Sequence, residues 1–235
     1  MVSESQKDGA LLHERLDKLE EEGRIPVRNS GECIQMRWQW EEFPSGVHYA
    51  APTDPNAMGR YNDPTSQTGI CYTADYAAAA IAESLGRVYQ RSPGEFILGM
   101  SDLQKAHMYT LTTTRDTRTI DMSRLQGMLH ITADQTMGND HSITQAITNW
   151  AANTPGLNYD GISYRSRHFD AGMCTAFWVR EGISGPLADV ARQSVDSYVD
   201  TNLENFPQGW QESDISGFDI VVETLQFSVS ADDSK

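Results

Sequence analysis

The sequence predicts an α+β fold, with a mixed sheet core and flanking helices. Runs of β-favouring residues recur along the chain, and four other stretches show helical periodicity. The two kinds of segment do not alternate regularly, which argues against a βαβ arrangement. The chain has 235 residues and is 39% hydrophobic, which is enough to bury one substantial core. One globular domain is therefore the expected organisation.

The first helix is expected at residues 8–22, in a polar segment that carries an apolar stripe. Its leucines recur at helical spacing, at Leu11, Leu12, Leu16 and Leu19. Gly23 ends the pattern and Pro26 follows it. Because such stripes usually face a core, we expect this helix to pack on the domain itself rather than on a partner.

The remaining elements follow from local patterns. A strand is expected at residues 33–40, before a Pro- and Gly-rich loop at 43–58. A second strand at 69–73 leads into an Ala-rich helix that continues to about Gln90, with Thr73 or Asp75 as its N-cap. Further strands are expected at 95–100, 107–113, 117–122, 160–165, 174–180 and 218–229, and further helices near 142–152 and 187–199.

Charge and composition disfavour several classes of protein. The 18 basic and 33 acidic side chains give a formal net charge of −15, so we expect no nucleic-acid partner, because a phosphate backbone would be repelled. No apolar run approaches the roughly 20 residues that span a bilayer, and the first residues lack the pattern of a secretory signal. We expect a cytoplasmic site of action, either for a resident protein or for one delivered into another cell.

Motifs for metals and nucleotide cofactors do not occur. Cys33, Cys71 and Cys174 lie far apart, and the six histidines form no H-E-x-x-H pattern. Neither the G-x-G-x-x-G fingerprint nor a P-loop is present, so a dehydrogenase or a kinase is disfavoured. We predict no metal site and no bound cofactor.

The first candidate for chemistry is Gly59-Arg60-Tyr61-Asn62, just before a turn at Pro64. The guanidinium of Arg60 can bind a pyrophosphate through two parallel hydrogen bonds, and the ring of Tyr61 can stack on a flat ligand. The alternative is structural, with Arg60 bridging the loop to a nearby carboxylate such as Asp63. Taken alone, the motif favours the structural alternative.

Glu83 is the second candidate, and it lies nearly opposite the apolar stripe of its predicted helix. Helix geometry alone favours an exposed pair with Arg87, four residues on, which would contribute only about 0.3–0.5 kcal/mol. A functional role instead requires this face to line a cleft, where the small Ala79 and Ala80 would leave room for a ligand.

The third candidate segment, residues 160–168, begins as an alternating strand and ends in a polar cluster. Ser166 could hydrogen-bond a ribose or an amide, and Arg165 or Arg167 could offset phosphate charge, although such residues more often cap a strand end. A Ser-His-Asp hydrolase is weakly supported, because Ser166 lacks a G-x-S-x-G context and His168 is only two residues away.

Taken together, these segments resemble the RES domain, a family named for its Arg, Glu and Ser. The resemblance is carried by Gly59-Arg60-Tyr61-Asn62, Gly69-Ile70-Cys71-Tyr72, Ala80-Ile81-Ala82-Glu83 and Gly161-Ile162-Ser163-Tyr164-Arg165-Ser166. An early strand arginine, Arg37, also fits, so the resemblance spans about residues 34–178. The link between Arg60 and Tyr72 is longer than in compact members and contains a proline.

The resemblance implies an ADP-ribosyltransferase-like fold and three regions. These are an N-terminal helical extension at 1–30, a catalytic core at 31–182, and an acidic C-terminal extension at 183–235 with a late strand packed on the core. It also implies an enzyme that consumes NAD as its substrate, typically a toxin neutralised by a separate antitoxin or immunity protein.

In that family resemblance, Arg60, Glu83 and Ser166 are the expected catalytic residues. Arg60 would hold the pyrophosphate, Glu83 would stabilise charge on the ribose or hold its hydroxyls, and Ser166 would position the nicotinamide ribose or amide. Ser163 competes with Ser166 for this role. The remaining NAD-binding residues would be Arg37, Tyr61, Asn62 and Tyr72, with Tyr61 or Tyr72 against a ring.

The acceptor of the ADP-ribosyl group is open, because water, phosphate and a protein side chain would all use the same NAD-holding residues. We expect an NAD glycohydrolase or phosphorylase, with a mono-ADP-ribosyltransferase as the alternative. A non-catalytic acidic interaction protein ranks last, because it leaves the spaced Arg-Tyr-Glu-Ser set without an explanation.

Overall fold

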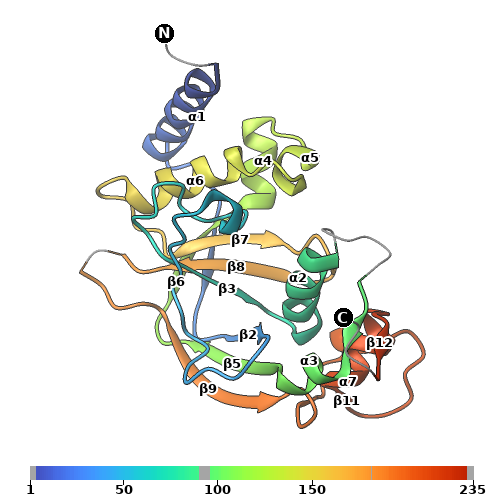
Figure 1. The fold of residues 1–235 in the computed structure, drawn as a ribbon. Helices are drawn as coiled ribbons and strands as arrows, with labels where there is room; N and C mark the ends of the chain where they lie inside the picture. Colours follow the sequence, from blue (N-terminus) through green and yellow to red (C-terminus); the bar gives the residue numbers. More distant parts are fainter. Residues whose placement is uncertain (1–3, 90–95, 181, 232–235) are drawn as a thin grey trace.

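The computed structural model describes residues 4–89, 96–180 and 182–231. Its centre is an eight-stranded sheet with the order β1-β6-β7-β8-β3-β2-β5-β9. These strands are β1 (Val27–Ser30), β2 (Ile34–Gln39), β3 (Ile70–Ala74), β5 (His107–Thr113), β6 (Thr117–Asp121), β7 (Gly161–Arg165), β8 (Met173–Trp178) and β9 (Leu187–Ser194). Neighbouring strands are antiparallel except for β6 and β7, which are parallel. Helices cover this mixed sheet (Figure 1), which confirms the expected α+β class.

The other elements are helices, single turns and two small two-stranded sheets. The helices are α1 (Glu4–Glu21), α2 (Ala77–Tyr89), α3 (Met100–Lys105), α4 (Met122–Leu129), α5 (Ala133–Met137), α6 (Ser142–Asn153) and α7 (Gly217–Asp219). Single turns lie at Pro55–Ala57, Leu203–Asn205 and Ile220–Thr224. Two small sheets pair β10 (Val199–Asp200) with β11 (Ile215–Ser216), and β4 (Leu98–Gly99) with β12 (Val229–Ser230).

The main sheet opens between β2 and β3. These two strands pair only at Met36 and Ala74, whereas β3 pairs with β8 through all of its five residues. Helix α2 crosses the opening and packs against β2 (Figure 1). The divergence of the two strands therefore leaves space beneath α2, and the pocket described below forms there.

Helix α1 packs on α6, as expected for a helix that belongs to the domain. Leu16 from its apolar stripe is fully buried. The indole of Trp150 on α6 donates a hydrogen bond to the Asp17 carboxylate at 2.7 Å, and the hydroxyl of Tyr159 contacts Glu20. Both polar and apolar contacts therefore join the N-terminal helix to the core.

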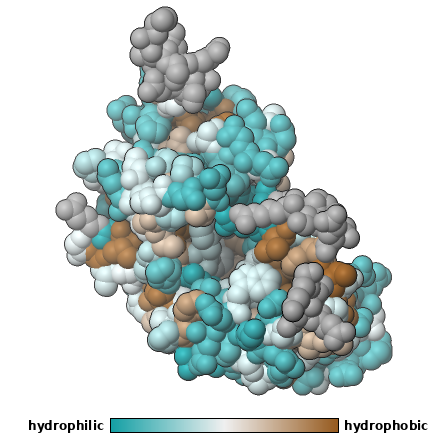
Figure 2. Space-filling model, in the orientation of Figure 1, coloured by the Kyte–Doolittle hydropathy of each residue, from teal (hydrophilic) through white to brown (hydrophobic). Residues whose placement is uncertain are grey.

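The exterior is mainly hydrophilic in the view of Figure 2, in keeping with the net charge of −15. Within the described part of the chain, no helix is long and apolar enough to cross a membrane. The core lies between the sheet and the helices, where α2 contributes a continuous buried run at its first six positions, Ala77, Ala78, Ala79, Ala80, Ile81 and Ala82.

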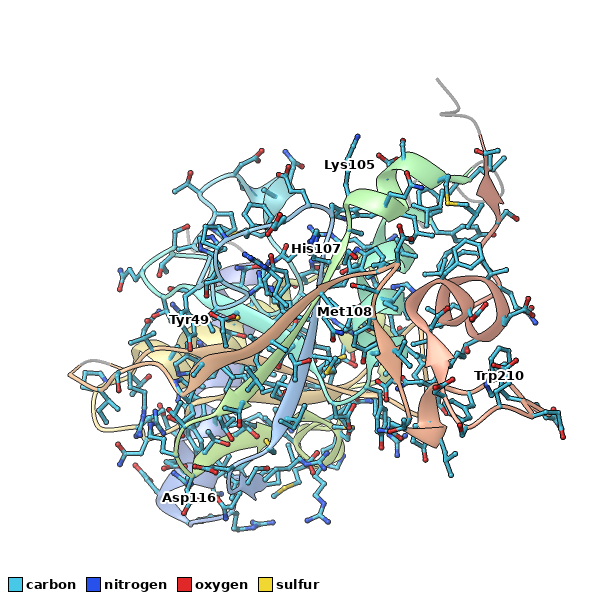
Figure 3. The ribbon with its side chains drawn as sticks, turned by 90° about the horizontal axis from the view of Figure 1, so that it is seen from below. Tyr49, Lys105, His107, Met108, Asp116 and Trp210 are labelled. Atoms are coloured by element: carbon cyan, nitrogen blue, oxygen red, sulfur yellow. The ribbon has the colours of Figure 1, made fainter. Side chains whose placement is uncertain are left out.

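A smaller apolar layer lies on the other face of the sheet. It contains Cys71, Tyr109 and Phe177, and Tyr49 from the long loop packs against it. Figure 3 views the molecule from below, with Tyr49 labelled. The loop after β2 therefore covers this face, so that successive strand residues alternate between two buried environments.

Most expected elements are confirmed, but three expectations for strands and helices are wrong. The region near 187–199 was expected to be a helix and instead contains β9 and β10. The late strand expected at 218–229 is mostly helical, and only Val229 of that span is in a strand. The strand expected at 95–100 is reduced to Leu98–Gly99. Gln90 and residue 95 lie outside the described residues.

Tertiary contacts explain the first two differences. Strand β9 is held at the edge of the sheet by pairing with β5 along its length, including a bulge between Thr110 and Leu111. At the C-terminal end, Ser216 caps a helical turn by accepting a hydrogen bond from the amide of Asp219. The successive Ile220 and Val221 are then both fully buried, which a strand with one exposed face would not achieve.

The expected N-caps of α2 are also wrong. The hydroxyl of Thr73 donates to Gln35 at 2.6 Å, and the Asp75 carboxylate accepts from the amide of Met173 at 2.8 Å. The amide of Ala78 donates instead to the side-chain oxygen of Asn205 at 2.9 Å. A residue from the C-terminal part of the chain thus stabilises the start of the helix that carries Glu83.

Candidate functional site

A pocket of about 450 Å³ opens between α2, the diverging strands β2 and β3, and the loop after β7. This volume is typical of small-molecule sites. One face of α2 lines it through Ala80, Glu83, Ser84 and Arg87. A functional role for Glu83 required the helix face opposite the apolar stripe to line a cleft, and the structure satisfies that condition.

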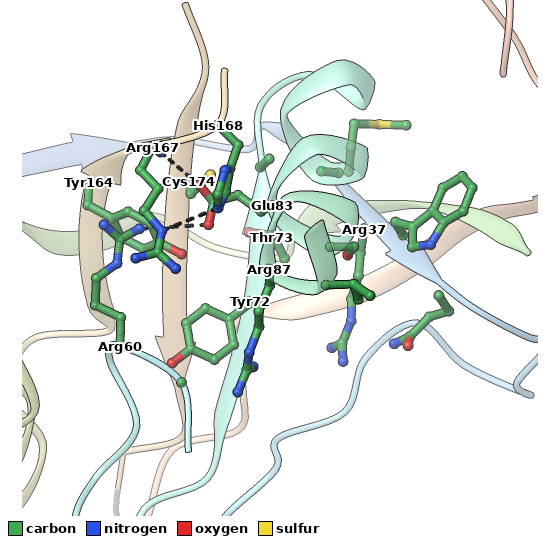
Figure 4. A pocket seen from close by; sticks show the side chains of 18 of the residues that line it. Arg37, Arg60, Tyr72, Thr73, Glu83, Arg87, Tyr164, Arg167, His168 and Cys174 are labelled. Atoms are coloured by element: carbon green, nitrogen blue, oxygen red, sulfur yellow. Dashed lines mark hydrogen bonds and ion pairs between the residues drawn. The ribbon is translucent and has the colours of Figure 1, made fainter. Parts of the chain in front are cut away.

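The three predicted catalytic residues, Arg60, Glu83 and Ser166, come together at the Glu83 carboxylate. Its Oε1 accepts hydrogen bonds from the hydroxyl of Ser166 at 2.7 Å and from the backbone amide of Arg167 at 2.9 Å. Its Oε2 lies 3.7 Å from Nη2 of Arg60. Figure 4 shows Glu83, Arg167 and His168 together at this end of the pocket. The carboxylate is thus fixed by neighbours on one side while a quarter of the side chain remains exposed.

The exposed Glu83–Arg87 pair does not form. The guanidinium of Arg87 donates to the carbonyl oxygens of Ala57 and Met58, each at 3.4 Å. The structural alternative for Arg60, a bridge to Asp63, does not form either. Asp63 instead accepts hydrogen bonds from backbone amides of its own turn, at Thr65, Gln67 and Thr68. Asp63 thereby organises the long link that precedes β3.

Arg60 is held in a buried position beside two aromatic rings. Its guanidinium carbon lies 4.8 Å from the centre of the Tyr164 ring and 5.3 Å from that of Tyr61. These two rings stack on each other at 4.3 Å. Because the flexible side chain is fixed by cation–π contacts and by Glu83, it can position the carboxylate without large motions.

Close backbone packing lets α2 reach the Ser166 loop. A Cβ atom built at Gly86 would lie 2.4 Å from the ring of His168. Glycine is therefore required at this position, despite its unfavourable helix propensity. Without this approach, the carboxylate of Glu83, one turn earlier in α2, would lie farther from the hydroxyl of Ser166.

Tyr61 and Asn62 lie behind the pocket rather than on its surface, and Tyr72 lines it. The Tyr72 hydroxyl accepts a hydrogen bond from the amide of Tyr61 at 3.0 Å and donates to Asn62 at 3.1 Å. Asn62 in turn accepts from the amide of Gly59 at 2.6 Å. These contacts hold the turn that presents Arg60, so Tyr61 and Asn62 have structural positions here.

The two serines of β7 and its following loop lie in different environments. The hydroxyl of Ser163 contacts those of Thr119 at 2.7 Å and Thr175 at 3.2 Å, within the sheet. Tyr164, the next residue, faces the pocket. Because strand residues alternate between faces, Ser163 is directed away from Glu83, whereas Ser166 contacts it.

Arg37 lines the far end of the pocket, but its guanidinium is already occupied. Its Nη1 donates to the carbonyls of Gly46 at 3.0 Å and His48 at 3.2 Å, and it lies 2.7 Å from Sγ of Cys71. The side chain therefore holds the long loop against the sheet. The structure does not bring Arg37 to Glu83 with Arg60 and Ser166.

The pocket is also lined by residues that were not predicted as catalytic or NAD-binding. They include Trp38, Trp40, Arg87, His141, Tyr164, Arg167 and His168. Strand alternation from Ser163 and helical spacing from Glu83 could have indicated Tyr164 and Arg87. No sequence signal connects His141 to the site, because it precedes α6 in a different part of the chain.

Burial shifts the pKa values of two histidines and one cysteine in the pocket. It lowers the pKa of His141, which the nearby Arg167, Arg60 and Arg87 lower further. It also lowers the pKa of His168, where Glu83 opposes the effect. Burial raises the pKa of the Cys174 thiol well above its usual range. At neutral pH the arginines are therefore the cations of this pocket. In the described residues, no cluster of three or more His, Cys, Asp or Glu side chains could hold a metal.

Comparison with known proteins gives the family. A RES domain match covers residues 34–196, more than half of the chain. This chain belongs to the RES domain family. The match includes Arg60, Glu83 and Ser166 and extends through β9. Among curated proteins, none matches this chain.

The RES domain chain is also similar in structure to a chain in the crystal structure of the M. tuberculosis MbcT-MbcA toxin-antitoxin complex. The TM-score is 0.56 at 17% sequence identity, and the alignment covers 96% of this chain and 99% of the other. At this identity, the likeness shows a shared fold over nearly the whole length of both chains.

Proposed function

We propose that this protein is an NAD-degrading toxin enzyme that cleaves the bond between nicotinamide and ribose, with water or phosphate as the acceptor. The observation that carries the proposal is the convergence of Arg60, Glu83 and Ser166 from three segments at one pocket. The pocket volume of about 450 Å³ is compatible with at least the reacting half of a dinucleotide. Membership of the RES domain family supports the same conclusion.

The proposed reaction breaks the bond between the ribose anomeric carbon and the pyridinium nitrogen. The bonding electron pair leaves with nicotinamide, which becomes neutral, and positive charge develops on the ribose. The acceptor oxygen then bonds to the same carbon, and water loses one proton to solvent when it is the acceptor. A carboxylate next to the ribose stabilises the developing charge, and Glu83 supplies it.

The neighbours of Glu83 suit this role. Ser166 and the amide of Arg167 hold one oxygen, and Arg60 lies beside the other. A carboxylate held by fixed donors need not reorganise when charge develops, which is the source of its catalytic advantage. The face of Tyr72 lines the pocket and is available to pack against a planar group of the substrate.

The toxin assignment rests on the family and on the fold. The similar M. tuberculosis structure is that of a toxin-antitoxin complex. We therefore propose that this chain acts on cytoplasmic NAD and that a separate antitoxin or immunity protein restrains it. NAD is a substrate in this proposal, and neither a bound cofactor nor a metal is invoked.

The proposal is tested by incubating purified protein with NAD and measuring free nicotinamide by chromatography. We expect release by the wild type and strong loss in Arg60→Ala, Glu83→Ala and Ser166→Ala. Ser163→Ala is the matched control, because that serine contacts the sheet instead of Glu83. Equal rates in the wild type and in Glu83→Ala would show that the proposed site is wrong.

Product analysis with and without added phosphate then identifies the acceptor. Hydrolysis gives ADP-ribose, whereas phosphorolysis gives a phosphorylated ADP-ribose that requires inorganic phosphate. Label that remains bound to protein after incubation of a lysate with labelled NAD would instead favour transfer to a protein side chain.

A further inference from the structure

The pocket concentrates positive charge in a strongly acidic protein. Four arginines line it, at positions 37, 60, 87 and 167, whereas Glu83 is the single carboxylate in its lining among the described residues. The whole chain has a formal charge of −15. A local excess of cations against this background attracts an anionic ligand and repels a cationic one.

The guanidinium groups of two of these arginines, Arg37 and Arg60, are already bound by other parts of the protein. All three nitrogens of the Arg37 guanidinium are occupied, because Nη1 donates to the carbonyls of the long loop and Nε and Nη2 donate to the side-chain oxygen of Gln39 at 2.8 and 2.9 Å. Arg60 is paired with Glu83, is 8% exposed, and lies against the rings of Tyr61 and Tyr164. Neither guanidinium is therefore free to form the parallel hydrogen bonds that a phosphate requires.

Arg87 and Arg167 have no such carboxylate partner. Within the described chain, neither guanidinium forms an ion pair, and the oxygen atoms that they contact are backbone carbonyls. Arg87 reaches Met58 at 3.4 Å, and Arg167 reaches Met137 at 2.8 Å. Burial lowers the pKa of Arg167, the charges of Arg60 and Arg87 lower it further, and the charge of Glu83 opposes them. Among the described residues, two guanidinium groups thus share one pocket without an ion-paired carboxylate.

Arg87 lies between the two ends of the pocket. Figure 4 shows Arg60 and Arg37 on opposite sides of the view, with Arg87 between them. Glu83 lies at the Arg60 end, and Trp38 and Trp40 belong to the β2 end. In NAD the pyrophosphate lies between the two nucleosides, so a nicotinamide riboside at Glu83 would direct the pyrophosphate toward Arg87.

We infer that Arg87 and Arg167 bind the pyrophosphate of NAD, and that Arg60 instead positions Glu83. This assignment rests on the proposed function for the identity of the substrate. The two arginines approach from different elements, α2 and the loop after β7. They can therefore contact the pyrophosphate from two sides, with the adenosine directed toward Trp38 and Trp40.

The first test compares NAD with nicotinamide riboside, which has the same scissile bond but no phosphate. Arg87→Gln and Arg167→Gln should each lower kcat/KM for NAD by about 10- to 100-fold, mainly through KM, because each removes a charged hydrogen bond. Their kcat/KM for nicotinamide riboside should equal that of the wild type. Equal losses with both substrates, or no loss with NAD, would overturn the assignment.

Arg165→Gln is the matched control. This arginine belongs to the same segment, is exposed, and donates to the carbonyl of Asp170 at 3.3 Å outside the pocket. It should leave both substrates unaffected. Arg167→Lys keeps the charge but not the fork, so partial recovery relative to Arg167→Gln would support phosphate binding over a purely structural role.

A binding measurement separates this inference from the proposed reaction. In the Glu83→Gln background, calorimetry with ADP-ribose and with inorganic pyrophosphate should give affinities that fall about tenfold or more when Arg87 is replaced by Gln. If these ligands bind in this way but the wild-type protein releases no nicotinamide from NAD, the anion site is supported and the proposed function is wrong. If the wild type releases nicotinamide but replacing Arg87 leaves both affinities unchanged, the proposed function is supported and the role of Arg87 is wrong.

Discussion

Two arginine–carboxylate clusters in this domain differ in what surrounds the carboxylate. Asp160 is 2% exposed, and its Oδ1 lies 2.8 Å from Arg115 and 2.9 Å from Arg180. Glu83 is 25% exposed and lies 3.7 Å from Arg60. Asp160 is enclosed by its partners, whereas Glu83 borders an open pocket. One ion cluster therefore joins buried strands, whereas the other lies at the edge of a cavity.

The chain positions of the two carboxylates explain the difference. The amide of Asp160 donates to the carbonyl of Arg118 in β6, and its carbonyl accepts from the amide of Trp178 at the end of β8. Its side chain also accepts from the amide of Arg118 at 2.9 Å. Both arginines of that cluster reach the carboxylate. In the pocket, Arg87 and Arg167 reach none among the described residues. Unmatched cations next to a cavity are thus the sharper indication of a binding site.

The comparison predicts its largest effect on stability at Asp160. Asp160→Asn removes the shared partner of two arginines and should lower the free energy of unfolding by about 3–5 kcal/mol. Urea denaturation measures this change. Nicotinamide release per folded molecule should remain at the wild-type level, and selective loss of activity at unchanged stability would erase the distinction between the two clusters.

Glu83→Gln should have the opposite profile. It preserves the size of the side chain but removes the charge that stabilises the ribose, so kcat for nicotinamide release should fall by about 100- to 1,000-fold. Thermal unfolding should show a Tm close to that of the wild type, because the carboxylate is partly exposed. A Glu83→Gln protein with a clearly lower Tm and the specific activity of the wild type would count against the proposed role.

Asp63 extends the comparison to a buried carboxylate whose partners are neutral. Burial raises its pKa, but hydrogen bonds from Asn153, Thr65 and Asn149 lower it to about 2 from the ordinary 3.8. The resulting stabilisation is fully present above pH 3.8 and is lost as the pH falls toward 2. Its size is on the order of 2 kcal/mol.

Asp63→Asn should therefore lower the free energy of unfolding by about 2 kcal/mol at neutral pH. It should also make stability less dependent on pH between about 4 and 2. Equilibrium unfolding at a series of pH values measures both effects. If the stability of this variant falls between about pH 4 and 2 as much as that of the wild type, groups other than Asp63 cause the loss.

The smallest expected effect concerns the helix that carries Glu83. Asn205→Ala removes the acceptor for the amide of Ala78 and should cost about 1 kcal/mol of stability, with a modest loss of activity as the start of α2 loosens. Asp121→Ala, which removes the N-cap of α4, is the control and should leave activity unchanged, because no residue of that helix lines the pocket. Activity losses of the same size in both would rule out a specific role for the Asn205 contact.

Local sequence patterns predicted much of the architecture. The β-favouring runs at β5, β7 and β8 and the helical periodicity of α1 and α6 belong to elements that their own residues specify. The region near 187–199 could not be predicted in this way, because the edge of β5 provides the hydrogen bonds that make β9 a strand. The buried helical turn at Ile220–Thr224 likewise depends on packing against α2.

The candidate site, like the fold, could be predicted only in part from the sequence. Arg60, Glu83 and Ser166 were recognisable from the sequence through their spacing and the family resemblance, and the α+β class followed from the pattern of elements. Helix geometry gave Glu83 an exposed position and Arg87 as its partner. Only the tertiary structure decided that this helix face borders the gap between β2 and β3, and that Arg87 and Arg167 share the pocket without a carboxylate of their own. The physical reason is that spacing along a chain defines which residues share a face, whereas the charge and solvent around that face depend on what the fold places opposite it.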